Sequence, residues 1–213
     1  MKNFVSFEGG EGSGKSTQAK LLFDSIKKIT KRVILTREPG GSVKIDFIRK
    51  LIVSSDYNFD PITELFLINA ARNEHIKKII LPSIKVNKIV ICDRFVDSTY
   101  AYQVFGKGVD KFIFEQLNEI IIKKVLPEVT FLIDINPIVG IERSLKRKNN
   151  EIKFENYKID YHKRVRKAFN KISKISDRII KIDGKQTKRD IHRIVVDYFN
   201  KKKILKKEIS YSL

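Results

Sequence analysis

Eight residues near the amino terminus have the types and the spacing of a phosphate-binding loop. The segment reads Gly-Gly-Glu-Gly-Ser-Gly-Lys-Ser and matches the pattern G-x-x-x-x-G-K-S. Glycines let backbone N–H groups turn toward an anion, and the helix that follows adds its positive end. The motif predicts that Lys15 reaches the β- and γ-phosphates of a nucleoside triphosphate and that the Ser16 hydroxyl holds Mg²⁺. The residues expected to contact the triphosphate are Gly9, Gly10, Glu11, Gly12, Ser13, Gly14, Lys15 and Ser16.

Two further segments place arginine and carboxylate side chains directly after apolar runs. Arg37 lies in Thr36-Arg37-Glu38-Pro39-Gly40-Gly41, where the proline and the paired glycines predict a tight turn. Asp93 and Arg94 follow the run Ile89-Val90-Ile91-Cys92. In phosphate-loop proteins an acid at the end of a buried strand holds Mg²⁺, so we expect Asp93 to be the second metal ligand. Arg94 would then bridge the donor and acceptor phosphates.

Candidate contacts for a nucleoside lie in two other segments. Hydroxyl, aromatic and amide groups in Asp97-Ser98-Thr99-Tyr100-Ala101-Tyr102-Gln103 are suited to reading a nucleobase, although the two tyrosines would equally fit packing on the core. Arg72 falls on the same helical face as Glu64 and Ile68. A ligand-binding arginine and a surface arginine lying along an apolar strip are equally compatible with that position.

The elements that must position these groups alternate along the chain. Apolar runs typical of buried strands cover 4–7, 32–36, 88–92, 129–135 and 178–182. Amphipathic stretches predict helices at about 16–30, 42–53, 62–84, 109–124, 137–148, 155–175 and 187–203. This alternation favours an α/β fold in which helices flank one parallel five-stranded sheet. Ligands of such sheets bind at the carboxyl ends of the strands, where the phosphate loop, Arg37 and Asp93 are expected.

Length and composition bound the class of protein. A chain of 213 residues with 42% hydrophobic content favours one globular domain over 1–213. No apolar run approaches the ~20 residues that cross a bilayer, so we expect a soluble, cytoplasmic protein without a membrane partner. The single cysteine, Cys92, excludes an internal disulfide and is expected to be a small buried core residue.

The formal net charge of +19 raises the possibility of a nucleic-acid partner. The basic residues are spread along the chain, however, and a positive field also serves small polyanionic substrates. We therefore expect no nucleic-acid partner.

One segment, from Arg143 to Glu155, breaks the alternation because it is highly charged and almost without apolar residues. A solvated turn between two helices is one interpretation. A mobile lid whose cations close over phosphates is the other, and the phosphate loop favours it.

Together these segments resemble bacterial thymidylate kinase. The resemblance covers almost the whole chain and follows the same order and spacing. It rests on 9–16 with Glu11, on Thr-Arg-Glu-Pro-Gly-Gly at 36–41, on Ala70-Ala71-Arg72, and on Asp93-Arg94 with 98–103. The stretch at 36–41 is the most specific piece. The resemblance implies a fold of the phosphate-loop nucleoside monophosphate kinase type, a homodimer, and phosphorylation of dTMP to dTDP by ATP with Mg²⁺, a step toward dTTP.

Carried over to this chain, the resemblance assigns the substrate contacts. The phosphate loop would bind ATP, and Glu11 would reach the deoxyribose 3′-hydroxyl. The phosphate and nucleoside of dTMP would be bound by Arg37, Ile68, Arg72, Arg94, Ser98, Tyr102 and Gln103, with Tyr102 and Gln103 at the thymidine end. The catalytic cations would be Lys15, Arg94 and Lys153.

This chain departs from the family pattern in two places. The family usually has a base-stacking phenylalanine four residues before the helical arginine, where this chain has Ile68, and Phe66 lies on another helical face. The bacterial form also supplies an arginine from its lid, where the aligned residue here is Lys153. Arg147 and Arg143 are alternative lid cations, and the sequence does not choose among the three.

Two other functions remain open at this point. The replacement at Ile68 is compatible with a kinase for another nucleoside monophosphate. A nucleotide-dependent switch or a nucleic-acid-dependent ATPase would also contain a phosphate loop, but the guanine-specificity pattern N-K-x-D of a switch is absent from the sequence.

Overall fold

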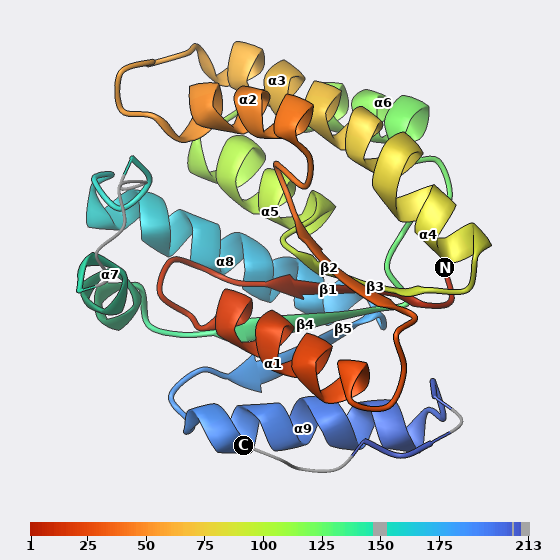
Figure 1. The fold of residues 1–213 in the computed structure, drawn as a ribbon. Helices are drawn as coiled ribbons and strands as arrows, with labels where there is room; N and C mark the ends of the chain where they lie inside the picture. Colours follow the sequence, from red (N-terminus) through yellow and green to blue (C-terminus); the bar gives the residue numbers. More distant parts are fainter. Residues whose placement is uncertain (147–152, 206, 210–213) are drawn as a thin grey trace.

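The computed structural model describes residues 1–146, 153–205 and 207–209, and these contain a five-stranded sheet (Figure 1). Neighbouring strands are parallel, in the order β2-β3-β1-β4-β5. The predicted α/β class is confirmed, and each strand lies within one residue of its predicted run. The strands are β1 Phe4–Glu8, β2 Val33–Arg37, β3 Ile89–Asp93, β4 Val129–Asp134 and β5 Ile179–Asp183.

Helices cover both faces of the sheet (Figure 1). Helices α1 and α9 pack on one face, and α3, α5, α6 and α8 contribute to the core on the other. The helices are α1 Lys15–Lys27, α2 Val43–Val53, α3 Pro61–His75, α4 Leu81–Lys85, α5 Val96–Thr99, α6 Lys111–Ile121, α7 Pro137–Leu145, α8 Ile159–Ile175 and α9 Lys188–Lys201, with two π-helical segments, η1 Ile76–Ile80 and η2 Tyr100–Gly106.

Each strand feeds both cores because successive side chains of a strand point to opposite faces. Phe4 and Val90 join the core under α3 and α8, whereas Val5 and Ile91 join the core under α1 and α9. Burial on both faces explains why the strands appear in the sequence as continuous apolar runs. Cys92 is fully buried among them, as predicted.

Two helical predictions were wrong in detail. The single helix predicted at 62–84 is divided by the π-turn η1, which directly precedes Leu81-Pro82. Proline lacks an N–H and its ring clashes with the carbonyl four residues earlier, so a wider turn there is expected. The helix predicted at 155–175 begins only at Ile159, and the candidate nucleoside contacts after Arg94 lie in α5 and η2.

The sheet order determines where ligands can bind. The connection after the central strand β1 leads to β2 on one side, whereas the connection after its neighbour β3 leads to β4 on the other side. In open α/β sheets the crevice at such a reversal, outside the carboxyl ends of the strands, is the usual ligand site. The phosphate loop follows β1 at this point. No helix among the described residues is both long and apolar enough to span a bilayer.

Candidate active site

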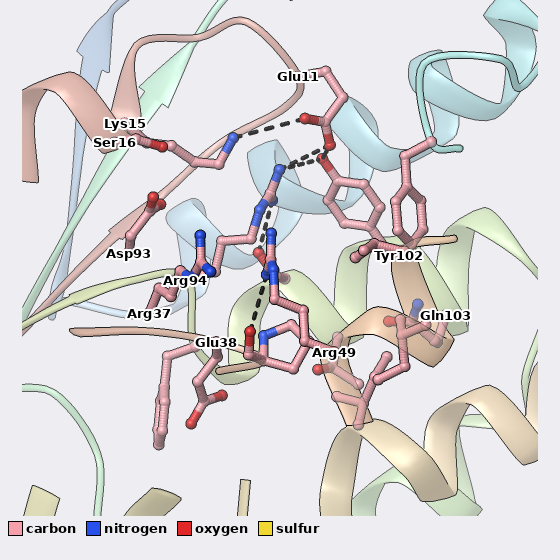
Figure 2. Close-up of a pocket in the computed structure, with 18 of the residues that line it drawn as sticks. Glu11, Lys15, Ser16, Arg37, Glu38, Arg49, Asp93, Arg94, Tyr102 and Gln103 are labelled. Atoms are coloured by element: carbon pink, nitrogen blue, oxygen red, sulfur yellow. Dashed lines mark hydrogen bonds and ion pairs between the residues drawn. The ribbon is translucent and has the colours of Figure 1, made fainter. Parts of the chain in front are cut away.

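A cavity of about 300 Å³ opens at the carboxyl edge of the sheet (Figure 2). The walls come from the phosphate loop, the β2–α2 turn, helices α2 and α3, the end of β3 and η2. Most of the residues that were predicted from the sequence meet here: Glu11, Gly12, Gly14, Lys15, Ser16, Arg37, Ile68, Arg72, Asp93, Arg94, Ser98, Tyr102 and Gln103. Gly9, Gly10 and Ser13 belong to the loop but lie outside the cavity wall, and Lys153 lies elsewhere.

The phosphate loop depends on glycine at two positions. Gly14 is the N-cap of α1 with a φ of 98°, and Gly12 has a φ of 62°. A Cβ atom on Gly12 would lie 1.8 Å from the carbonyl oxygen of Gly140 in α7. Glycine therefore allows α7 to approach the loop backbone while the loop N–H groups stay open to an anion at the start of α1.

Lys15 and Glu11 are adjacent in the folded loop. Lys15 Nζ donates to the carbonyl of Gly10 at 3.2 Å and lies 3.9 Å from Glu11 Oε2. Burial and the nearby Arg94 guanidinium lower the pKa of Lys15. Burial alone would raise the pKa of Glu11, but Arg94 and Lys15 outweigh it and lower that pKa to about 2. Lys15 and Arg94 thus place two cations beside the phosphate loop, where an anionic ligand would bind.

Arg94 lies at the end of β3 and faces the phosphate loop across the cavity (Figure 2). Its Nη1 donates to Gly9 O at 3.1 Å and to Ser98 Oγ at 3.0 Å. Its Nη2 donates to Glu11 Oε1 at 2.8 Å and to Tyr102 Oη at 3.1 Å. The guanidinium also lies 4.8 Å from the centroid of the Tyr102 ring. These contacts fix the planar fork in one orientation, as a preorganised phosphate-binding group requires.

Glu8 supports Arg94 from behind. The Glu8 carboxylate accepts from the backbone N–H of Phe95 at 2.7 Å and from the Ser98 hydroxyl. Ser98 in turn accepts from Arg94, so a chain of hydrogen bonds links the end of β1 to the guanidinium. Burial and the charge of Asp97 raise the pKa of Glu8 to about 8.

Arg72 belongs to a buried network rather than to the surface. It is 2% exposed, and its Nε donates to Glu38 Oε2 at 2.7 Å while its Nη2 donates to Thr99 Oγ1 at 2.8 Å. His75 Nδ1 donates to the other Glu38 oxygen at 2.9 Å, and its Nε2 lies 2.7 Å from Thr36 Oγ1. The network attaches the turn after β2 to α3. Of the two interpretations left open by the sequence, a surface arginine is therefore wrong for Arg72.

The side chains predicted to bind Mg²⁺ suit that ion. Asp93 Oδ1 is buried and has no hydrogen-bond partner among the described residues. Ser16 lies on the same side of the cavity, at the start of α1 (Figure 2). Mg²⁺ is usually held by one or two protein oxygens together with water and substrate phosphates. The described part of the chain contains no denser cluster of three or more His, Cys, Asp or Glu that could hold a metal. The two oxygens therefore fit a nucleotide-bound Mg²⁺.

The aromatic residue that the family usually places on α3 has no counterpart on the cavity side of this helix. Ile68 is 7% exposed and lines the cavity, whereas the Phe66 side chain is 53% exposed and is not part of the wall. An aromatic ring reaches the cavity instead from the segment before α8, where Phe154 packs edge-on against Tyr102 with ring centroids 5.7 Å apart.

Lys153 lies away from the phosphate loop. Its Nζ donates to the carbonyls of Ile52 at 2.9 Å and Tyr57 at 2.7 Å, and the side chain is 8% exposed. Of the two alternatives, Arg143 donates to the carbonyl of Gly184 at 3.1 Å, and Arg147 lies outside the described residues together with the rest of 147–152. A catalytic role for Lys153 stays a prediction, and it would require the two carbonyl contacts to break.

Several lining residues were not found from the sequence. Arg49 on α2 reaches the cavity and donates to the carbonyl of Pro39 at 2.9 Å. Thr99 orients Arg72, and Ser144 and Glu155 meet at the lid side with 2.6 Å between their oxygens. The sequence could have suggested Arg49, because it is a cation in the predicted helix that follows the turn at 36–41.

Similarity to known proteins extends over the whole fold. The family model described as thymidylate kinase matches residues 7–195. The chain is 43% identical to a thymidylate kinase of Wolbachia pipientis wMel, covering 91% of this chain and 98% of that one. It is 42% identical to a thymidylate kinase of Sulfurihydrogenibium sp. strain YO3AOP1, covering 96% and 100%. A crystal structure of thymidylate kinase from Ehrlichia chaffeensis matches with a TM-score of 0.75 and 36% identity, covering 92% and 97%.

Proposed function

The chain belongs to the thymidylate kinase family, and we propose on that basis that it transfers the γ-phosphoryl group of ATP to dTMP, forming ADP and dTDP. The observation that carries the proposal is the continuity of one cavity. Its walls include Lys15 and Ser16 of the phosphate loop and also Arg72 and Gln103, beyond Arg94. A donor triphosphate and an acceptor nucleotide can therefore meet in one enclosed space.

The proposed reaction requires little covalent chemistry from the protein. A phosphate oxygen of dTMP attacks the γ-phosphorus of ATP, and the bond from that phosphorus to the bridging oxygen of ADP breaks. Charge spreads over the transferred group in the transition state, so fixed cations around it lower the barrier. Lys15 and Arg94 are suited to this role because both are oriented by hydrogen bonds, Lys15 as a buried and Arg94 as a partly buried side chain.

Mg²⁺ bound with ATP would neutralise part of the charge on its β- and γ-phosphates, and Ser16 and Asp93 would hold it. Arg37, at the end of β2, is half-exposed and lies 3.9 Å from Asp46, so it is free to turn toward an incoming acceptor phosphate. Glu11 and Tyr102, whose oxygens lie 2.7 Å apart, would receive the deoxyribose, and the Glu11 carboxylate would accept from its 3′-hydroxyl.

The proposal extends to the assembly and the location of the enzyme. Helices α2, α3 and α6 lie together on one side of the molecule (Figure 1). Three phenylalanine side chains of these helices are more than half exposed, namely Phe47, Phe66 and Phe112. We propose that a second copy covers this face in a homodimer, which sedimentation of the purified protein tests. Because ATP and dTMP are cytoplasmic metabolites, we place the enzyme in the cytoplasm. We also propose that residues 143–155, of which 147–152 lie outside the described part of the chain, act as its lid.

A panel of acceptors tests the proposed function. ADP formation from ATP is followed by a coupled assay with dTMP, dUMP, dCMP, dGMP or dAMP as the second substrate. We expect the highest kcat/KM with dTMP. A higher kcat/KM with a purine nucleotide or with dCMP would contradict the proposal, as would ATP turnover that needs DNA or RNA but no nucleotide acceptor.

A further inference from the structure

A buried carboxylate lies directly behind the cavity wall at Gln103. Glu64, on α3, is 0% exposed and does not line the cavity. Its Oε1 accepts from Gln103 Nε2 at 2.9 Å, and its Oε2 accepts from Lys107 Nζ at 2.8 Å. Gln103 itself lines the cavity from η2 and lies at its wall in Figure 2. One side of the Gln103 amide therefore faces Glu64 and the other faces the ligand space.

The chemistry of the carboxylate fixes which end of the amide faces which side. An ionised carboxylate has only acceptor positions, so the Gln103 NH₂ must point toward Glu64. The amide is planar, and its carbonyl oxygen is then directed away from Glu64. No described residue donates a hydrogen bond to that oxygen, and Gln103 lines the cavity. The oxygen is therefore an acceptor that is open to a ligand in the cavity.

Lys107 makes this arrangement stable. It stands one turn after Gln103; its side chain is 9% exposed, and its ammonium contacts Glu64. Together with the Lys153 ammonium, which lies 3.8 Å from Glu64 Oε2, this cation compensates the buried negative charge. Lys107 and Gln103 approach the same carboxylate from the same segment, so the contact also fastens η2 to α3. The Glu64–Lys107 ion pair therefore sets the orientation of the Gln103 amide before a ligand binds.

We propose that Glu64 is a positioning residue that selects the nucleobase, because it forces Gln103 to offer only an acceptor oxygen to the bound acceptor nucleotide. This inference rests on the proposed function. The ring N–H of thymine, or of uracil, can donate to this oxygen. Cytosine has a lone pair on the corresponding ring nitrogen, and two acceptors would then face each other without a hydrogen. An unpaired buried polar group costs about 1–3 kcal/mol, enough for roughly tenfold or greater discrimination.

The test replaces Glu64 by glutamine, which has the same shape but offers both a donor and an acceptor. In Glu64→Gln the Gln103 amide can pair in either orientation. We expect the ratio of dissociation constants for dCMP and dTMP, measured by calorimetry, to fall about tenfold or more. The value of kcat at saturating dTMP should change much less, because Glu64 does not touch the phosphates. A general structural defect would instead lower kcat and weaken the binding of dCMP and dTMP by the same factor.

Two further variants make the result interpretable. Glu115→Gln removes an equivalent but exposed carboxylate on α6 and should leave the ratio unchanged. Glu64→Gln with Lys107→Met removes the carboxylate together with the cation that donates to it, and Lys153 keeps its contacts with the carbonyls of Ile52 and Tyr57. The double variant can therefore be measured if the single variant fails to fold. A folded Glu64 variant that keeps the parent ratio would overturn the inference while leaving the proposed function intact. Unmodified protein that does not bind dTMP would instead contradict the proposed function, and the inference with it.

Discussion

Arg94 Nη2 lies 2.8 Å from Glu11 Oε1, so the residue directly after β3 is joined to the middle of the phosphate loop. The same guanidinium reaches Ser98 and Tyr102, and a lysine ammonium cannot make these contacts together. We therefore expect Arg94→Lys to lower kcat/KM for dTMP by about 10²-fold with little loss of stability. Steady-state kinetics test this, with the exposed Arg193→Lys as a control. If the variant keeps the kcat/KM of the parent, the reaction does not depend on the planar guanidinium of Arg94.

The unpartnered oxygen of Asp93 predicts a metal-dependent phenotype. Asp93→Asn keeps the size of the side chain but removes its charge, so the Mg²⁺ concentration for half-maximal activity should rise or activity should disappear. The measurement is a Mg²⁺ titration at fixed ATP and dTMP. Asp160→Asn, which changes an exposed carboxylate on α8, serves as the control. If the titrations of Asp93→Asn and the parent coincide, Asp93 does not hold the metal.

Lys153 connects the segment before α8 to α2. Its ammonium holds the carbonyl of Ile52, whose side chain lines the cavity together with Val53. Loss of this contact in Lys153→Ala should raise the KM for dTMP about tenfold or more and leave kcat at saturating substrates nearly unchanged, since a hydrogen bond from a charged group contributes about 1.5–3 kcal/mol. A large fall in kcat with an unchanged KM would show instead that the ammonium reaches the phosphates during turnover.

Glu8 predicts how stability depends on pH. Its pKa of about 8 in the folded protein lies above the ordinary value of 4.5, so the folded state keeps this proton where the unfolded state loses it. Stability contributed by neutral Glu8 is complete below about pH 4.5 and is lost as pH rises toward about 8. Urea unfolding at several pH values should show a smaller loss of stability over this window in Glu8→Gln. Parallel curves for the two proteins would contradict the raised pKa.

The sheet was predictable because its strands are buried on both faces. Such strands are continuous apolar runs, and Ile89 to Cys92 is an example whose bounds needed only one residue of correction. The π-helical segment η2 was not predictable in the same way. Its polar members Gln103 and Tyr102 are as buried as its apolar members, so it lacks the polar-to-apolar period by which helices are recognised.

The site was predictable where chemistry fixes local spacing, as in the phosphate loop and Asp93-Arg94. It was not predictable where packing between distant segments decides what a side chain touches. Lys153 has the charge of a lid cation, but its contacts with Ile52 and Tyr57 arise from the approach of α2. The role of Glu64 likewise depends on a partner 39 positions away along the chain.

The most direct test of the account follows the phosphoryl group itself. ATP labelled with ³²P at its γ-phosphate is incubated with the protein, Mg²⁺ and dTMP, and the products are separated by chromatography. We predict one labelled dTDP for each ADP formed and, because a preorganised cation is lost, a rate about 10²-fold or more lower in folded Lys15→Ala. The control Lys20→Ala, an exposed lysine of α1, should match the parent. Label in inorganic phosphate, or no labelled dTDP, would contradict the account.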